Sequence, residues 1–267
     1  MPGDSGRATT AFADERQTRI ADLVSMRGRA RIGELARLLG VTEPTIRKDL
    51  SALQERGLIK RTHGGALALQ PAVQRDLAGR ETTNRPAKEA IARACLGLLQ
   101  DGDSVFLDSG TTVNTIATAL AADSQRPCLS TLTSSLGVAG ALADVPGIEC
   151  TLLGGQVRPV DGAVVGPLAV ENLQRFTFGV AFLGVSGFSE HGISVGSIAE
   201  SEVKSQAIGR ARRVVVPVDH AKVGITDFAR IAGLEVLDVV VLDKTTPAVE
   251  QLCANFSIEL IVADGSS

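Results

Sequence analysis

The sequence of 267 residues predicts an α/β protein with a small N-terminal domain and a larger domain built on a mostly parallel sheet. Before residue 70, apolar residues recur at helical spacing in short segments and then alternate as in a hairpin. Residues 70–84 are polar, contain Pro71 and lack periodicity, as in a linker. Beyond residue 85, apolar runs of strand length alternate with helical stretches. We expect domains at 13–68 and 86–264, joined by a linker at 69–85.

The composition is that of an ordinary soluble protein, with 44% hydrophobic and 21% charged residues. The four cysteines are scattered without CxxC spacing, which favours buried reduced thiols and no metal site. Residues 1–12 lack the apolar core of a signal peptide, and no apolar run reaches about eighteen residues. We therefore expect a cytoplasmic protein without a membrane segment, and the motifs imply no cofactor.

The charge is divided between the two parts of the chain. Residues 1–64 hold twelve Lys and Arg against eight Asp and Glu, whereas the remainder holds fifteen against twenty-two. A basic N-terminal part followed by an acidic remainder is typical of a domain that binds a polyanion, attached to a domain that does not.

The first residues predict three short helices. Asp14–Met26 carries apolar residues at helical spacing, and Ile32–Leu39 repeats that pattern before Gly40. Thr42 is a favourable N-cap for a third helix, in which Pro44 falls in the first turn and costs no helical hydrogen bond. A helix, a three-residue turn and a second helix form the helix-turn-helix pattern of DNA-binding proteins.

The third helix has an apolar and a polar face. Its apolar residues lie within about 60° of one another at 100° per residue and are expected to pack: Ile46, Leu50 and Leu53. Thr45, Arg47, Lys48 and Ser51 lie on the flanks or the opposite side. The arginine and lysine can reach guanine or phosphate, and the threonine can reach a thymine methyl or a phosphate. A solvated charged face on an ordinary helix is the alternative.

A basic hairpin follows this helix. Leu58–Arg61 and Ala66–Leu69 alternate around the expected turn pair Gly64-Gly65. Lys60, Arg61 and His63 are expected near the hairpin tip along the phosphate backbone, although His63 could also be a simple turn residue. The expected DNA contacts are Thr42, Thr45, Arg47, Lys48, Ser51, Arg61 and His63.

In the larger domain, polar and small residues follow one strand after another. The expected strands are Val105–Leu107, Leu129–Leu132, Cys150–Leu153, Val180–Val185, Val214–Val218, Val236–Leu242 and Leu260–Val262. The helices expected between them are Thr112–Ala122, Ser134–Ala143, Leu168–Phe176, Ile198–Ala211 and Pro247–Phe256. Because ligands bind beyond the carboxyl ends of parallel strands, the residues at those ends are candidate ligand contacts.

These strand ends suit a phosphate. Asp108-Ser109-Gly110-Thr111-Thr112 leads directly into a helix, whose N-terminal amides and positive dipole end favour anions. The remaining candidates at the same edge are Ser134, Gly154, Gly155, Ser186, Asp219 and Lys222. Neither GxGxxG nor GxxxxGK[ST] is present, which favours a phosphorylated metabolite over a dinucleotide or ATP.

Two sets of residues carry a resemblance to a known family. Thr45-Ile46-Arg47-Lys48-Asp49-Leu50 and Arg61-Thr62-His63-Gly64-Gly65-Ala66 resemble the DNA-binding head of DeoR-type bacterial repressors. Many relatives have a second arginine where this chain has Lys48, which lacks the bidentate fork. Asp108–Thr112, Leu153-Gly154-Gly155, Gly184-Val185-Ser186-Gly187, Glu202-Val203-Lys204 and Val218-Asp219-His220-Ala221-Lys222 resemble the effector domain of the same family. The resemblance covers about 250 residues, nearly the whole chain.

The resemblance implies an effector domain with a fold like that of ribose-5-phosphate isomerase, and a phosphorylated sugar or sugar derivative as effector. It implies that Asp108 to Thr112 hold the phosphate, with Asp219 and Lys222 at the sugar end. Lys204 also matches the pattern and is a candidate, although Glu202 and Lys204 could equally be an exposed surface pair on a helix.

The expected function is that of a transcriptional regulator, most simply a repressor of carbohydrate-metabolism genes. It would bind a double-stranded DNA operator as a homo-oligomer and release it when a sugar phosphate occupies the body. One alternative is an isomerase-like enzyme that uses Asp219 and Lys222 for acid–base chemistry. Another is an activator or architectural DNA binder without an effector. The DNA-binding head, for which an isomerase has no use, favours the regulator.

Overall fold

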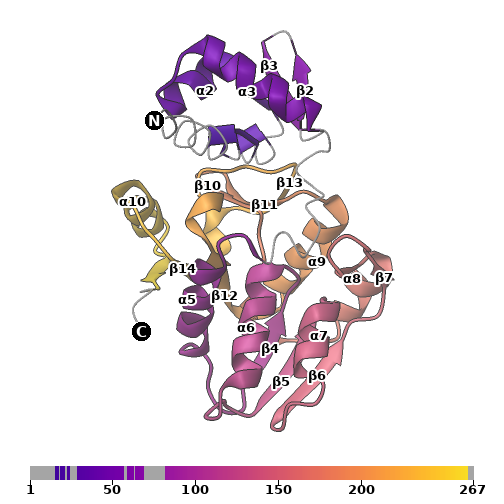
Figure 1. Ribbon diagram of the computed structural model, residues 1–267. Helices are drawn as coiled ribbons and strands as arrows, with labels where there is room; N and C mark the ends of the chain where they lie inside the picture. Colours follow the sequence, from indigo (N-terminus) through magenta and orange to yellow (C-terminus); the bar gives the residue numbers. More distant parts are fainter. Residues whose placement is uncertain are drawn as a thin grey trace, which may run out of the picture. The chain divides into compact units, whose positions relative to one another are not determined.

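The computed structural model describes residues 16–17, 19–21, 23–24, 29–56, 59–62, 64–68 and 82–263 (Figure 1). The chain divides into two compact units, residues 1–74 and 75–267, which are described separately below. None of the helices among these residues is long and apolar enough to cross a membrane.

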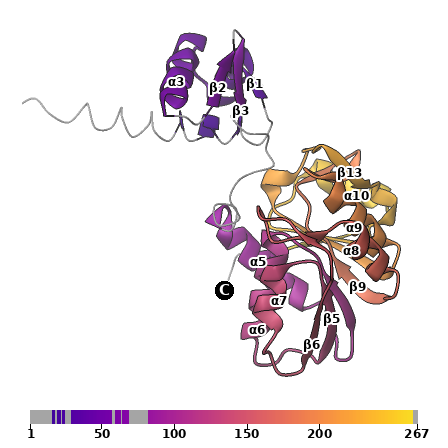
Figure 2. The same ribbon diagram turned by 90° about the vertical axis from the view of Figure 1, so that its right-hand side faces the viewer.

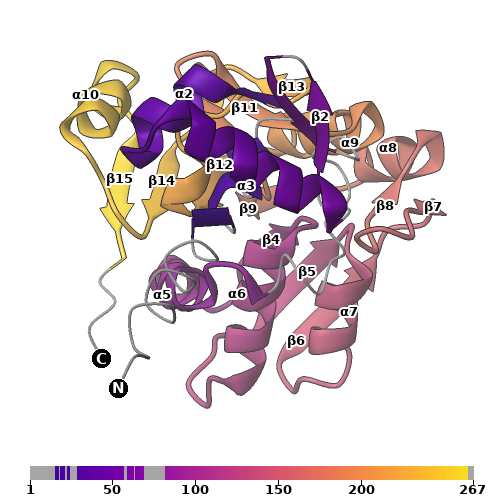
Figure 3. The same ribbon diagram turned by 45° about the horizontal axis from the view of Figure 1, so that its top comes forward.

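The described part of the first unit contains helices packed on a small antiparallel sheet. Its elements are β1 Arg29–Arg31, α2 Ile32–Leu39, α3 Glu43–Glu55, β2 Ile59–Thr62 and β3 Gly65–Ala68, with the sheet order β1-β3-β2. Figure 3 shows α2, α3 and β2. The described residues between 16 and 24 are helical, as predicted. Gly40 ends α2 in the left-handed conformation (φ 65°) and Thr42 stands at the N-cap of α3. Strand β1 was not predicted, because three residues are too few to show alternation.

The hairpin turn differs from the prediction by one residue. Thr62 pairs with Gly65, so Gly65 is the first residue of β3 and not part of the turn. Gly65 also pairs with Arg31, and a Cβ on it would lie 2.0 Å from the carbonyl oxygen of Ala30. Gly65 therefore allows β1 to pack closely against β3. The local sequence does not reveal this close packing.

A buried carboxylate on α3 joins this helix to the helical residues 16–17. Asp49 is 3% exposed and accepts hydrogen bonds from Arg16 Nε at 2.7 Å and Gln17 Nε2 at 3.2 Å. The hydrogen bond to Asp49 raises the pKa of the Arg16 guanidinium. The apolar core of this unit lies beside the pair and includes Ile20 and Val24.

The second unit is built on a seven-stranded parallel sheet. Its strands are β4 Ser104–Leu107, β5 Leu129–Thr133, β6 Ile148–Leu152, β9 Phe178–Phe182, β12 Ala211–Val218, β14 Val239–Leu242 and β15 Glu259–Val262. The order β15-β14-β12-β9-β4-β5-β6 is that of a doubly wound sheet, in which the chain reverses direction between β4 and β9. The predicted α/β class is confirmed.

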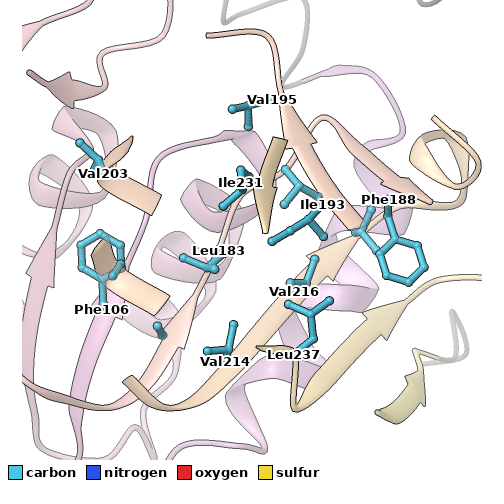
Figure 4. Packing of buried hydrophobic residues seen from close by; sticks show 14 of the residues in the cluster. Phe106, Leu183, Phe188, Ile193, Val195, Val203, Val214, Val216, Ile231 and Leu237 are labelled. Atoms are coloured by element: carbon cyan, nitrogen blue, oxygen red, sulfur yellow. The ribbon is translucent and has the colours of Figure 1, made fainter. Parts of the chain in front are cut away.

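Helices cover both faces of this sheet (Figure 2). The helices are α5 Arg85–Leu96, α6 Thr111–Ala122, α7 Leu136–Leu142, α8 Pro167–Leu173, α9 Ile198–Ile208 and α10 Pro247–Asn255. Alternate strand residues face opposite layers: Val105 and Leu107 pack with α5, α6 and α7, whereas Phe106 packs with α8, α9 and α10. Phe106, Leu183, Val214 and Val216 are part of the second layer's core (Figure 4).

Two small sheets and one short helix depart from the prediction. Strands β10 Gly187–Ser189, β11 Gly192–Val195 and β13 Ala229–Ala232 form an antiparallel sheet, and β7 Gln156–Val157 pairs with β8 Val164–Val165. Residues Leu234–Val236 form a 3-10 helix, so the strand expected from Val236 begins only at Val239. Apolar content alone did not separate this turn from the strand that follows it.

The cysteines are less uniformly buried than expected. Cys95 and Cys253 are buried, and burial raises the pKa of both thiols, whereas Cys128 is exposed. All four are free thiols, in agreement with the sequence. The exposed Cys128 directly precedes β5, and its apolar neighbours in the sequence belong to that strand.

We predict that Asp49→Asn destabilises the first unit. The substitution removes the carboxylate that pairs with Arg16, at an expected cost of about 1–3 kcal/mol. Differential scanning calorimetry of the full chain would show a lower melting temperature for this unit. Glu43→Gln on the same helix removes an exposed ion pair and is expected to change stability by less than about 0.5 kcal/mol. Equal effects of the two substitutions would contradict the assignment.

Candidate functional site

The third predicted helix, α3, presents the expected polar face. Ile46, Leu50 and Leu53 are buried, whereas Arg47 and Lys48 are exposed. A groove of about 830 Å³ runs beside α2 and α3. Its lining includes Arg31, Arg37 and Arg47 together with Glu34 and Glu43. The arginine side chains supply the positive charge that a phosphate backbone requires.

Several of the expected DNA contacts are bonded to one another. Arg47 Nη2 pairs with Glu43 Oε2 at 2.9 Å, and both side chains are about half exposed. The hydroxyl of Thr42 lies 3.0 Å from that of Thr45 and makes no capping hydrogen bond to the backbone. A DNA contact by Arg47 would require the loss of this ion pair, at a small cost, because exposed i,i+4 pairs contribute only about 0.3–0.5 kcal/mol.

The hairpin is tied to the same helix. Arg61 Nη1 donates to Ser51 Oγ at 2.7 Å, and the Arg61 backbone N–H donates to Gln54 Oε1 at 2.9 Å. Ser51 in turn donates to the carbonyl oxygen of Arg47. These bonds hold β2 in a defined position beside α3, a role for Ser51 and Gln54 that the sequence did not suggest. His63 lies outside the described residues.

In the second unit, Asp108 is the centre of a buried polar network at the reversal point of the sheet. Ser134 Oγ donates to its Oδ1 at 3.0 Å, and the Gly184 N–H donates to its Oδ2 at 3.0 Å. Lys204 Nζ on α9 is hydrogen-bonded to the same Oδ2, and both partners are at most 2% exposed. The network joins the ends of β4, β5 and β9 to α9.

Gly184 allows the strands to meet this closely. A Cβ on it would lie 2.0 Å from the carbonyl oxygen of Ser109. Only glycine therefore fits between β9 and the loop that follows β4.

The loop after β4 ends in the N-terminus of α6. Gly110 is the N-cap, and the first helical hydrogen bond runs from Asn114 N–H to the Gly110 carbonyl. The amides of Thr111, Thr112 and Val113 thus precede the first helical bond. Within the described part of the chain, Thr112 Oγ1 is the one fully buried side-chain oxygen or nitrogen without a hydrogen-bond partner.

A second polar group lies beyond β12. Asp219 is 3% exposed and accepts from the N–H of Ala221 at 3.1 Å and from Asn84 Nδ2 at 3.0 Å. Lys222 Nζ lies 3.8 Å from Asp219 Oδ2 and donates to the Val185 carbonyl at 2.8 Å. Since Val185 follows Gly184, this group adjoins the Asp108 network at the end of β9.

The other candidates lie around these two groups. Ser186 Oγ donates to Asp227 Oδ2 at 2.6 Å, beside the small antiparallel sheet. Gly154 and Gly155 are exposed between β6 and β7, and no backbone hydrogen bond among the described residues joins them to either polar group. Glu202 is exposed but Lys204 is buried, so the exposed Glu202–Lys204 pair considered above is wrong.

Comparison with known proteins identifies the family of both units. The family described as "DeoR C terminal sensor domain" matches residues 83–244, and "DeoR-like helix-turn-helix domain" matches residues 16–72. The chain belongs to the DeoR family of transcriptional regulators. It is 34% identical to the HTH-type transcriptional repressor GlcR of Bacillus subtilis, over 95% of this chain and 97% of that protein. It is 31% identical to the glycerol-3-phosphate regulon repressor of Escherichia coli, over 92% and 97%.

A solved structure similar to part of this chain is ribose 5-phosphate isomerase A of Methanocaldococcus jannaschii. It has 17% sequence identity and a TM-score of 0.39, over 53% of this chain and 55% of that chain.

This DeoR-family sensor domain also contains charged residues that the sequence did not single out. Arg158 lies 3.3 Å from Asp161 and 3.2 Å from Glu200, and all three side chains are less than one-fifth exposed. Glu200 stands one turn before Lys204 on α9. Burial raises the pKa of Glu200 to about 7, although the positive charges of Lys204 and Arg158 oppose this shift. The contact between Arg158 and Glu200 joins the segment between β7 and β8 to the distant helix α9, so sequence spacing did not reveal it.

The raised pKa of Glu200 predicts a pH-dependent stability. The folded sensor domain holds a proton on Glu200 more tightly than the unfolded chain does. This contribution is therefore full below the ordinary glutamate pKa of 4.5 and is lost as pH rises through about 7. Stability should fall by on the order of 1–3 kcal/mol between about pH 5 and pH 8 from this group. Glu200→Gln should remove that part of the decline in urea unfolding experiments at the two pH values. An unchanged decline in Glu200→Gln would assign the pH dependence to other groups.

Proposed function

We propose that this DeoR-family regulator represses carbohydrate-metabolism genes and leaves its operator when a phosphorylated sugar or sugar derivative binds the sensor domain. The observation that carries the effector class is the N-terminus of α6. Amides that precede its first helical bond and a buried, unpartnered Thr112 hydroxyl lie next to Ser109, whose hydroxyl is 3.4 Å from Lys204 Nζ. Helix N-termini and hydroxyl donors are the usual ligands of phosphate in proteins.

The residues divide into binding and supporting groups. Both carboxylate oxygens of Asp108 are engaged by Ser134, Gly184 and Lys204, so Asp108 organises the loop and Ser109 to Thr112 supply the phosphate donors. In this proposal Asp219 and Lys222 bind the hydroxyl groups of the sugar, which is supported by the contact of Lys222 with the Val185 carbonyl beside the end of β9.

DNA binding belongs to the first unit. In this proposal Arg47 and Lys48 enter the major groove, while Arg61 lies along the phosphate backbone in the position set by Ser51 and Gln54. A homo-oligomer presents several such heads to repeated or palindromic half-sites and gains affinity through effective concentration. Release then requires that the effector bind the DNA-incompetent arrangement more tightly than the competent one.

The effector class is tested with an operator selected from a random DNA pool by the wild-type chain. Ribose 5-phosphate, fructose 6-phosphate, glucose 6-phosphate and glycerol 3-phosphate are titrated into the labelled complex. Glycerol 3-phosphate is included because a relative is named for it. At least one phosphate ester is expected to dissociate the complex, while the matching unphosphorylated sugars do not. Dissociation by none of the esters would contradict the proposed effector class, and turnover of an ester at ordinary enzyme rates would favour the isomerase alternative.

For DNA binding, we predict that Arg47→Ala weakens operator affinity by about 1–3 kcal/mol if Arg47 reads a guanine. Fluorescence anisotropy at fixed salt concentration measures the change. Glu43→Gln is the matched control, because it frees Arg47 from its ion pair without removing the guanidinium. The control should bind at least as tightly as the wild type. An unaffected Arg47→Ala variant would show that another face of α3 reads the DNA.

For effector binding, we predict that Thr112→Val leaves the sensor domain as stable as the wild type or more stable. The substitution removes a buried hydroxyl without a partner in the free protein, yet it also removes a donor to phosphate. The concentration of phosphate ester needed for half-release of the operator should rise about tenfold. Thr131→Val is the control: its hydroxyl is bonded to the Glu149 carbonyl, so the variant should lose stability and keep its response. Unchanged half-release in Thr112→Val would place the phosphate elsewhere.

A further inference from the structure

We propose that Asn84 is a positioning residue that holds Asp219 in the effector-free sensor domain, and that the effector takes its place on that carboxylate. This inference rests on the proposed function, because it assumes that Asp219 meets the effector. It adds a residue that links the effector site to the first helix of the sensor domain.

The contact joins residues that are 135 positions apart. Asn84 Nδ2 donates to Asp219 Oδ1 at 3.0 Å, and the Ala221 N–H donates to the same oxygen at 3.1 Å. Asp219 is 3% exposed. Asp219 Oδ1 already accepts these two hydrogen bonds, so a ligand that takes a hydrogen-bonding position on this oxygen must displace one of its two present donors. Since the Ala221 amide belongs to the same turn as Asp219, the side chain of Asn84 is the donor that can leave.

The backbone of Asn84 is held in an unusual conformation. Its φ is 54°, and among the described residues only Ser257 shares a positive φ without being glycine. Asn84 is the N-cap of α5, but its side chain makes no capping bond and is directed to Asp219 instead. The first helical bond of α5 nevertheless starts there, from Lys88 N–H to the Asn84 carbonyl. The bond to Asp219 thus supports a strained residue at the start of the helix.

This arrangement connects effector binding to the helix that follows the DNA-binding unit in the sequence. When the effector displaces the Asn84 amide, the strained N-cap loses its support and the first turn of α5 can rearrange. Residues 1–74 precede that turn in the chain. The Asn84–Asp219 hydrogen bond, present when no effector is bound, therefore favours the DNA-competent state. Part of the free energy of effector binding at Asp219 is used to break this hydrogen bond. Linkage requires that the effect be reciprocal: loss of the bond weakens operator binding and strengthens effector binding.

The test uses the full chain, the selected operator and the four phosphate esters named above. Asn84→Gly removes the amide and tolerates the positive φ, and Asn84→Asp places a carboxylate against Asp219. Without any ester, both variants should bind the operator at least threefold more weakly than the wild type. The ester concentration at which half of the operator is released should be at least threefold lower in Asn84→Gly than in the wild type. Amide hydrogen exchange in the first turn of α5 should be faster in both variants.

Ser257→Gly is the matched control, since it relieves the same backbone conformation at the turn before β15, and it should behave as the wild type. Operator and ester affinities that fall together would mean a merely structural role and would overturn the proposal, as would wild-type values for both. If no ester releases the wild-type complex, the proposed effector class fails. The operator affinity without ester and the hydrogen exchange then decide separately whether Asn84 maintains the DNA-competent state.

Discussion

The buried ion pair between Asp108 and Lys204 is the constraint on which the sensor domain depends. Two charges removed from water cost several kcal/mol each unless their remaining hydrogen-bonding capacity is also satisfied. Here that capacity is met by Ser134 and the Gly184 amide, with the Ser109 hydroxyl 3.4 Å from the ammonium group. The pair can be buried only if the ends of β4, β5 and β9 and one face of α9 come together. The ion pair contributes little net stability, yet it requires these strand ends and α9 to come together in one arrangement.

The same convergence creates the candidate effector site. The chain leaves β4 and β9 in opposite directions, and in doubly wound sheets ligands bind beyond the carboxyl ends of the strands at such a reversal. The Asp108 network forms the base of this region, and the N-terminus of α6 and the Asp219–Lys222 group lie on either side of β9. The donors proposed to bind the phosphate and the acceptor that organises the loop are therefore neighbours in the chain. Asp108, which sequence reasoning assigned to the phosphate, is better understood as the residue that shapes the loop.

The DNA-binding unit follows a similar division. Asp49 lies in the middle of the recognition motif, but it is buried and pairs with Arg16, so it stabilises the packing of α3. Ser51 and Gln54 connect the helix to β2, and Arg47 is held by Glu43 at a cost small enough for DNA to overcome. A polar helix face is thus partly a scaffold. Arg47 and Lys48 on this face are exposed.

The sequence by itself determined the two-domain organisation, the alternation of strands and helices, and the chemical character of each strand end. These features depend on local periodicity and on residues such as Gly110 or Thr112, whose positions follow from their neighbours along the chain. The tertiary structure alone decided which residues are partners. Lys204 bonds to Asp108 across 96 positions of the sequence, and Asn84 bonds to Asp219 across 135 positions. Arg158 joins Glu200 in a buried cluster, where desolvation raises the pKa of the glutamate. Periodicity carries no information about such pairs, because burial and charge compensation depend on where distant segments meet.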